Sequence, residues 1–175
     1  RNGSECEETR QGSMNFLFDM DGVLVDSKEA WFMAFREAGG VSRDTFEEKF
    51  WGRDLEANLK DIGMERTDFC ESVFAGYTEE IVAVRGAEEV LSSLEGKKAV
   101  ITNTTRRCTS GILEKTGLGR YFDAVITGDA VDKGKPDPGM VIRAMEMLGA
   151  RPRSTVVIGD SEEDMRAGSD AGCTT

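Results

Sequence analysis

Histidine is absent from all 175 residues of this chain. Its absence excludes Ser-His-Asp hydrolysis, phosphohistidine chemistry and zinc sites built on imidazole ligands. Any general acid or base must therefore be Asp, Glu, Lys, Tyr or Cys. Carboxylates are the most suggestive of these groups, and Asp and Glu together number 33.

Long apolar runs and an excess of basic residues are also lacking. No stretch approaches the ~20 apolar residues of a membrane span, and no apolar segment near the start has the form of a secretory signal. The net charge is −11, which argues against nucleic acid and anionic membranes as partners. We therefore expect a cytoplasmic protein without nucleic-acid or membrane partners. Its oligomeric state stays open.

Cysteines are few and scattered. The four residues lie far apart and none forms a CxxC pair, so free thiols in a reducing cytosol are expected rather than disulfides: Cys6, Cys70, Cys108 and Cys173.

The length of the chain predicts one domain, or one domain with a modest insertion. Residues 1–13 are polar, rich in Glu and without periodicity, and we interpret them as a disordered tail. A tag remnant ahead of a native initiator at Met14 is the alternative.

The stretch from Asn15 to Ser27 organises the rest of the sequence. The apolar run Phe16–Phe18 predicts an inner strand of a parallel sheet, so Asp19 would leave it at the carboxyl end, where open α/β sheets place their chemistry. Asp21 follows one residue later, and two acids so close repel each other unless a cation lies between them. The pair therefore indicates a divalent metal, with an acidic turn that caps a helix as the alternative.

Residues 28–84 are expected to be all-helical. Ser27 or Asp26 would cap a first helix through Ala38, and apolar positions at helical spacing continue to residue 82. We see no strand pattern in this block, although strands flank it. It is therefore predicted to be a helical cap inserted into a core made of residues 14–27 and 85–175.

After Gly86 the pattern alternates between helices and strands. Strands are predicted at 98–102, 124–127 and 155–158, with helices between and after them. Together with the first strand they predict a Rossmann-like, doubly wound parallel α/β sheet. The chain stops at Thr175, where a further strand would begin, so the strand at 155–158 is expected to lie at an edge.

Polar residues follow each of the four predicted strands. Because the carboxyl ends of parallel strands share one edge of the sheet, these residues should converge there. Taken singly, each has an ordinary explanation as strand, turn or solvated surface. Together they form the set that a phosphoryl-transfer site requires: Asp19, Asp21, Thr102, Asn103, Lys135, Asp160 and Asp164.

The chemistry of this set is consistent with phosphoryl transfer. Mg²⁺ prefers hard oxygen ligands, which Asp19, Asp160 and a backbone carbonyl would supply. A carboxylate can attack phosphorus to give an aspartyl-phosphate. Lys135, the Thr102 hydroxyl and backbone amides could neutralise the transferring group. Asp21 could protonate the leaving oxygen and later activate water.

Four stretches, in order, resemble the haloacid dehalogenase (HAD) superfamily, in its phosphoglycolate phosphatase-like branch with a small helical cap. They are FDMDGVLVDS at Phe18–Ser27, VITN at Val100–Asn103, KGKPDP at Lys133–Pro138 and GDSEED at Gly159–Asp164. The similarity covers about residues 14–173.

The resemblance implies a role for each site residue. Asp19 would be the nucleophile and a Mg²⁺ ligand, and Asp21 the general acid/base that binds the metal through its backbone carbonyl. Asp160 would be the third protein ligand of Mg²⁺. Thr102 and Lys135 would bind the phosphoryl group, the first with help from the Asn103 amide. Asp164 would hold a metal-bound water or orient Lys135.

The cap resembles one that closes over the site and reads the leaving group. Its loop Trp51-Gly52-Arg53 is the best candidate for contact with substrate, with a packed Trp51 and a solvated Arg53 as the alternative. Within the family, an acid at the position of Asp21 favours phosphate esters.

Three functions remain at this point. The first is a Mg²⁺-dependent phosphomonoester hydrolase acting on a small phosphorylated metabolite. A sugar phosphomutase of the β-phosphoglucomutase type is second, although such members usually carry a histidine. A non-enzymatic receiver domain is a remote third, because its acidic pair and acceptor aspartate lie on different strands.

Overall fold

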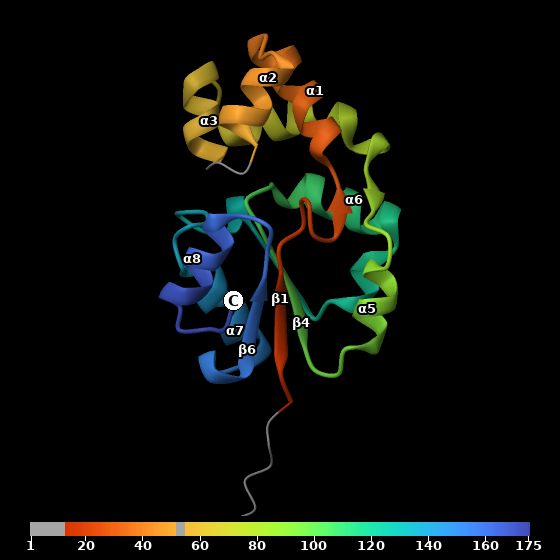
Figure 1. Ribbon diagram of the computed structural model, residues 1–175, viewed down its shortest axis with the longest axis vertical. Helices are drawn as coiled ribbons and strands as arrows, with labels where there is room; N and C mark the ends of the chain where they lie inside the picture. Colours follow the sequence, from red (N-terminus) through yellow and green to blue (C-terminus); the bar gives the residue numbers. More distant parts are fainter. Residues whose placement is uncertain (1–12, 52–54) are drawn as a thin grey trace, which may run out of the picture.

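The computed structural model describes residues 13–51 and 55–175. It shows an α/β core with a helical unit above the carboxyl ends of the core strands (Figure 1). The core sheet is parallel, with strand order β5-β4-β1-β6. The four predicted strands are confirmed, with bounds β1 Asn15–Phe18, β4 Lys98–Thr102, β5 Ala124–Thr127 and β6 Thr155–Ile158.

Helices cover both faces of this sheet (Figure 1). On one face, the buried side chains of Leu17, Ile101 and Val157 form a core cluster with helices α7 and α8. On the other, Phe18 and Val100 belong to a cluster that includes residues of α5 and α6 and continues into the cap. These helices are α5 Ala87–Ser93, α6 Arg106–Thr116, α7 Gly139–Leu148 and α8 Glu162–Asp170, with short 3₁₀ turns η4 Leu118–Tyr121, η5 Gly128–Ala130 and η6 Pro152–Ser154.

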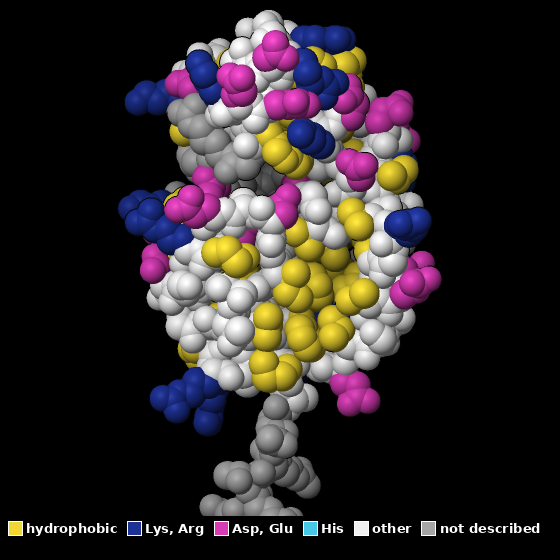
Figure 2. Space-filling model, viewed as in Figure 1, with side chains coloured by type: hydrophobic (Ala, Val, Ile, Leu, Met, Phe, Trp, Pro, Cys, Tyr) yellow, Lys and Arg dark blue, Asp and Glu magenta, His cyan; other side chains and the backbone are white. Residues whose placement is uncertain are grey.

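Strand β6 lies at the end of the sheet order, as predicted. On its far side the chain end forms one parallel bridge, in which Val157 N donates to Thr174 O at 2.8 Å and Thr174 N to Thr155 O at 3.1 Å. Figure 2 shows hydrophobic side chains gathered on the core below the cap. Half-buried Phe16 and Ile158 alternate with fully buried neighbours along their strands, which places the half-buried pair on the opposite face from α7 and α8.

The cap is helical but irregular. Its elements are α1 Lys28–Gly39, α2 Arg43–Thr45, the π-helix η1 Phe46–Phe50, α3 Leu55–Ile62, α4 Arg66–Asp68, the π-helix η2 Phe69–Val73 and the 3₁₀-helix η3 Phe74–Glu80. Stacked aromatic rings hold it together: the Trp31 ring lies 3.9 Å from Phe74 and 6.0 Å from Phe69, centroid to centroid. The aromatic spacing that predicted helices also supplies the cap with its own core.

The prediction that this block contains no strand is wrong, and Ser27 is the N-cap residue of α1 by position only. A short antiparallel pair, β2 Val25–Asp26 and β3 Val82–Ala83, connects core and cap, so the block predicted to be free of strands contains one. Strands of two residues carry too little periodicity to show in a sequence. The Ser27 side chain makes no capping hydrogen bond to α1 and is used elsewhere.

Among the described residues no helix is long and apolar enough to cross a bilayer. The described cysteines, Cys70, Cys108 and Cys173, are free thiols, as expected. Cys6 and the rest of residues 1–12 lie outside the described part of the chain, as does the prediction of a disordered tail.

Candidate active site

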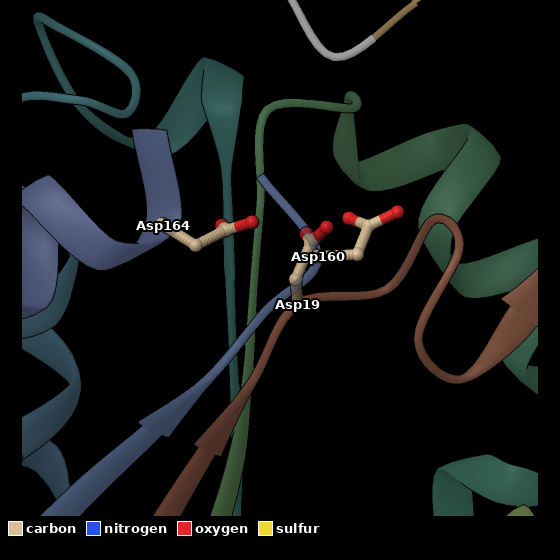
Figure 3. Close-up of side chains that lie close together, drawn as sticks. All are labelled: Asp19, Asp160 and Asp164. Carbon is tan, nitrogen blue, oxygen red and sulfur yellow. The ribbon is translucent and has the colours of Figure 1, made fainter. Parts of the chain in front are cut away.

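The predicted residues converge at the carboxyl edge of the sheet. Asp19 follows β1 directly, Thr102 ends β4, and Asp160 lies just beyond β6. Asp164 comes from the first turn of α8, and Figure 3 shows its carboxylate facing those of Asp19 and Asp160. Lys135 reaches the same point from the loop after β5. A parallel sheet thus brings together residues up to 145 positions apart.

Asp19 lies at the centre of the site and is 7 % exposed. Lys135 Nζ donates a hydrogen bond to its Oδ1 at 2.6 Å. Burial raises the pKa of Asp19 to about 7, against the opposing effect of the Lys135 charge and with smaller contributions from Asp164 and Asp21. Water is therefore largely excluded from this carboxylate, and its charge depends on nearby cations.

Lys135 is buried among three acceptors. Its ammonium donates to Asp19 Oδ1 and Asp164 Oδ1, both at 2.6 Å, and to the Ile101 carbonyl at 3.2 Å. Burial alone would lower the pKa of Lys135, but the two carboxylates together raise it above its ordinary value. Its neighbour Lys133 is exposed, which agrees with the choice of Lys135 from the sequence.

Asn103 fixes the backbone of the lysine loop. Its Oδ1 accepts a hydrogen bond from Lys135 N at 2.8 Å, and its Nδ2 donates to Lys135 O at 3.1 Å. A side chain at Gly134 would collide with this amide, so glycine is required there. Asn103 thus positions Lys135 through its side chain, and the action of its amide on the phosphoryl group stays a prediction.

Asp164 combines a helix cap with an ion pair. Its Oδ2 accepts a hydrogen bond from Ser161 N at 3.2 Å, and its own N donates to Ser161 Oγ at 3.3 Å, which together form a capping box at the start of α8. Oδ2 also accepts from Ser161 Oγ at 2.6 Å. Its Oδ1 holds Lys135, and the residue is fully buried. Asp164 thus holds Lys135 in place, and its part in the reaction stays a prediction.

The carboxylate of Asp21 points to a different set of donors. Its Oδ1 accepts from Ser27 Oγ at 2.7 Å and Trp31 Nε1 at 2.9 Å. Its Oδ2 accepts from Thr104 Oγ1 at 3.2 Å and Thr102 Oγ1 at 3.5 Å. Asp21 therefore connects the core strand β4 with the cap helix α1. The sequence did not predict these contacts of Ser27, Trp31 and Thr104. A hydroxyl residue just before a helix predicts a helix cap, and a tryptophan on an apolar helix face predicts a core position.

The acidic cluster fits a magnesium ion. Carboxylate oxygens of Asp19, Asp160 and Asp164 lie within 4.8 Å of one another. Partial desolvation and the neighbouring Asp164 charge raise the pKa of Asp160, a repulsion that a divalent cation would relieve. Gly22, at φ +81°, leaves room for the Asp160 carboxylate, which a side chain there would displace. Mg²⁺ prefers hard oxygen ligands of the kind that these three carboxylates offer. The Asp21 carboxylate already accepts four hydrogen bonds, which leaves the Asp21 backbone carbonyl as the predicted ligand.

A pocket lies between this site and the cap. The core side includes Asp19, Asp21, Thr102 and Lys135, and the cap side is mostly aromatic. Trp51 lines the pocket and also packs 5.9 Å from Phe46, so it belongs to the cap core, and its contact with substrate stays a prediction. Arg53, predicted to contact substrate, lies outside the described residues.

Arg66 contacts the core from the cap and was not predicted. Its guanidinium donates to the Gly128 carbonyl in the loop after β5 and lies 2.6 Å from Glu56 of α3. The side chain is 13 % exposed. A lone arginine after a glycine-ended helix carries no sequence signal for such a contact, which depends on how the cap sits on the core.

Known proteins resemble this chain over most of its length. The family model of the haloacid dehalogenase-like hydrolases matches residues 16–175. A phosphorylated carbohydrates phosphatase of Thermotoga maritima is 31 % identical over 173 residues, covering 89 % of this chain and 80 % of the relative. A phosphoglycolate phosphatase of Aquifex aeolicus is 29 % identical over 175 residues, covering 91 % and 81 %.

A solved structure shows the same fold. The crystal structure described as a putative phosphoglycolate phosphatase from Lactobacillus plantarum superposes with a TM-score of 0.81 at 22 % identity, covering 93 % of this chain and 84 % of that one. The family match and the fold match are consistent with the site described above, in which buried Asp19, Lys135 and an acidic cluster lie at one edge of the sheet. The chain belongs to the haloacid dehalogenase-like hydrolase family.

Proposed function

We propose that this hydrolase is a Mg²⁺-dependent phosphomonoesterase that acts on a small phosphorylated metabolite through an aspartyl-phosphate. One observation carries the proposal: Asp19 is buried beneath the pocket with Lys135 on one of its oxygens and Asp160 beside it. A carboxylate so placed has an oxygen for attack on phosphorus. The named phosphatases among its relatives support the reaction class.

Each side chain has a separate task in this proposal. The phosphoryl group lies between Asp19 and the donors Lys135 and Thr102, which offset its charge. Mg²⁺, bound by Asp19, Asp160 and the Asp21 carbonyl, would neutralise further charge on the transferring oxygens. As the ester P–O bond breaks and the Asp19 Oδ–P bond forms, Asp21 gives a proton to the leaving oxygen. Asp21 then takes a proton from the water that hydrolyses the intermediate.

The cap supports this sequence of steps. Ser27 and Trp31 donate hydrogen bonds to the Asp21 carboxylate, which lines the pocket, so the general acid is oriented by the segment that leads from core to cap. An apolar cap wall would exclude bulk water while the intermediate is present.

The test uses p-nitrophenyl phosphate with Mg²⁺ and then with excess chelator. We expect hydrolysis that requires the metal and is lost in Asp19→Asn, while Asp170→Asn, an exposed acid at the end of α8, keeps wild-type activity. Circular dichroism verifies that both variants are folded. Undiminished turnover by Asp19→Asn would refute the nucleophile assignment.

The phosphomutase alternative is tested in the same series. A mutase would convert a hexose phosphate to its isomer with little release of inorganic phosphate, whereas a phosphatase releases phosphate in step with substrate loss. The absence of histidine favours the phosphatase. The receiver alternative is excluded, because the hydrolase family model spans residues 16–175.

A further inference from the structure

Asn58 is a buried polar residue in the cap wall of the pocket. It lies on α3, is 2 % exposed, and lines the same pocket as Asp19 and Lys135. Its Nδ2 donates a hydrogen bond to the Phe50 carbonyl at 2.7 Å. Its Oδ1 is buried and has no hydrogen-bond partner among residues 13–51 and 55–175. One end of the amide is therefore fixed, while the other end is an unused acceptor.

An unpartnered buried acceptor is unfavourable in the free protein. Such a group has lost its hydrogen bonds to water and gained none from the protein. Reversal of the amide would not remove the cost, because Oδ1 would then face the Phe50 carbonyl, which is also an acceptor. Because Asn58 lines the pocket, a small shift of its side chain would let a donor on a bound molecule satisfy Oδ1.

The other described cap residues in this wall are apolar. They are Trp31, Phe35, Phe46, Phe50, Trp51 and Leu55. Their side chains carry no hydrogen-bonding group except the two indole N–H groups, and that of Trp31 already donates to Asp21. A leaving group here would contact aromatic faces and one carbonyl acceptor. A carboxylate would meet no cation among these described cap residues, and its oxygens would repel Oδ1.

We propose that Asn58 Oδ1 accepts a hydrogen bond from a hydroxyl group of the substrate's leaving group. The substrate class would then be a phosphate monoester of a neutral, hydroxylated alcohol or sugar, rather than of a hydroxy acid. This inference rests on the proposed phosphatase function and adds a specificity-determining residue to it. The aromatic rings would pack against the C–H groups of a polyol, and the Asn58 carbonyl oxygen would accept a hydrogen bond from its hydroxyl group.

The experiment compares matched small phosphate esters in the presence of Mg²⁺. Inorganic phosphate release gives kcat and KM for 2-hydroxyethyl phosphate, ethyl phosphate and phosphoglycolate, and for the three-carbon pair glycerol 1-phosphate and propyl phosphate. We expect the wild-type enzyme to favour the hydroxylated esters over the alkyl esters by about tenfold in kcat/KM, the size of one satisfied hydrogen bond. Phosphoglycolate should be the weakest two-carbon substrate.

Two variants of Asn58 test whether this residue is responsible. Asn58→Leu keeps the volume but removes the acceptor, so the preference should fall to about one, through a higher KM for the hydroxylated esters. Asn58→Ser is a smaller change for use if the leucine variant is unstable, and it should lower the preference in the same direction. Lys60→Ala, on the exposed side of α3, should keep the wild-type preference.

The outcomes separate the two proposals. A wild-type enzyme without preference for hydroxylated esters, or with phosphoglycolate as its best substrate, would overturn the role of Asn58 while leaving the phosphatase intact. A preference that survives in both Asn58 variants would overturn it as well. Failure of the wild-type enzyme to hydrolyse any ester, p-nitrophenyl phosphate included, would overturn the phosphatase and this inference together.

Discussion

Replacement of Lys135 by methionine should destabilise the metal-free protein in a pH-dependent way. The ammonium lies 2.6 Å from both Asp19 and Asp164, and its side chain is 5 % exposed. Methionine keeps the length of the side chain but leaves two buried carboxylates facing each other. Breaking a buried ion pair by removal of one partner costs about 3–5 kcal/mol.

The sign of the pH dependence follows from Asp19. Its pKa is already raised from 3.8 to about 7, and loss of the Lys135 charge removes the interaction that lowers it. An acid whose pKa is higher in the folded than in the unfolded protein binds more protons when folded, so acid favours folding. The cost of Lys135→Met should therefore be smaller at pH 5, where Asp19 can take up a proton, and should grow as the pH rises to 8.

The assay is thermal or urea unfolding with chelator present. For a chain of this size about 1 kcal/mol shifts Tm by about 2–4 °C, so the variant should melt roughly 6–20 °C below wild type at pH 8. Lys133→Met, an exposed lysine in the same loop, is the matched control and should melt as wild type does. An equal loss at pH 5 and pH 8, or no loss at all, would refute the role of buried charge.

Three further predictions concern the metal, the cap and a buried thiol. Mg²⁺ affinity should weaken by about tenfold per pH unit below 7, because the metal must displace the proton that Asp19 holds there. Calorimetry in two buffers with different ionisation heats measures this proton release. Arg66→Ala should lower kcat/KM by about tenfold or more, since it removes a charged donor that fastens the cap to Gly128, whereas Arg107→Ala, an exposed ion pair, should not. Cys70, whose pKa burial raises to about 12, should resist thiol reagents at pH 8 until the protein is unfolded, and rapid native labelling at this residue would contradict its burial.

The core of the fold was predictable because its signals are local. Each of the strands β1, β4, β5 and β6 is a short apolar run bounded by turn residues, and their bounds agree with the expectation within one residue. Asp19, Thr102 and Asp160 were predicted for the same reason, since each lies at the end of such a run or just beyond it. The parallel sheet then required them to meet at one edge.

The contacts between cap and core were not predictable from local patterns. Ser27 was expected to cap a helix but donates to Asp21 across the turn at Gly22. Asn58 and Arg66 resemble ordinary helix residues in the sequence, and their partners lie 8 and 62 positions away. Such contacts depend on how the cap packs, which propensity and periodicity do not encode.

The central claim is that Asp19 becomes phosphorylated during turnover. An Asp21→Asn variant, in which the acid/base is lost but Asp19 remains, should accumulate the intermediate with an activated substrate such as p-nitrophenyl phosphate. Rapid acid quench and peptide mass mapping should then find one phosphoryl group on the peptide that contains Asp19, and none in Asp19→Asn. A phosphoryl group on another residue, or hydrolysis without any covalent intermediate, would contradict the account.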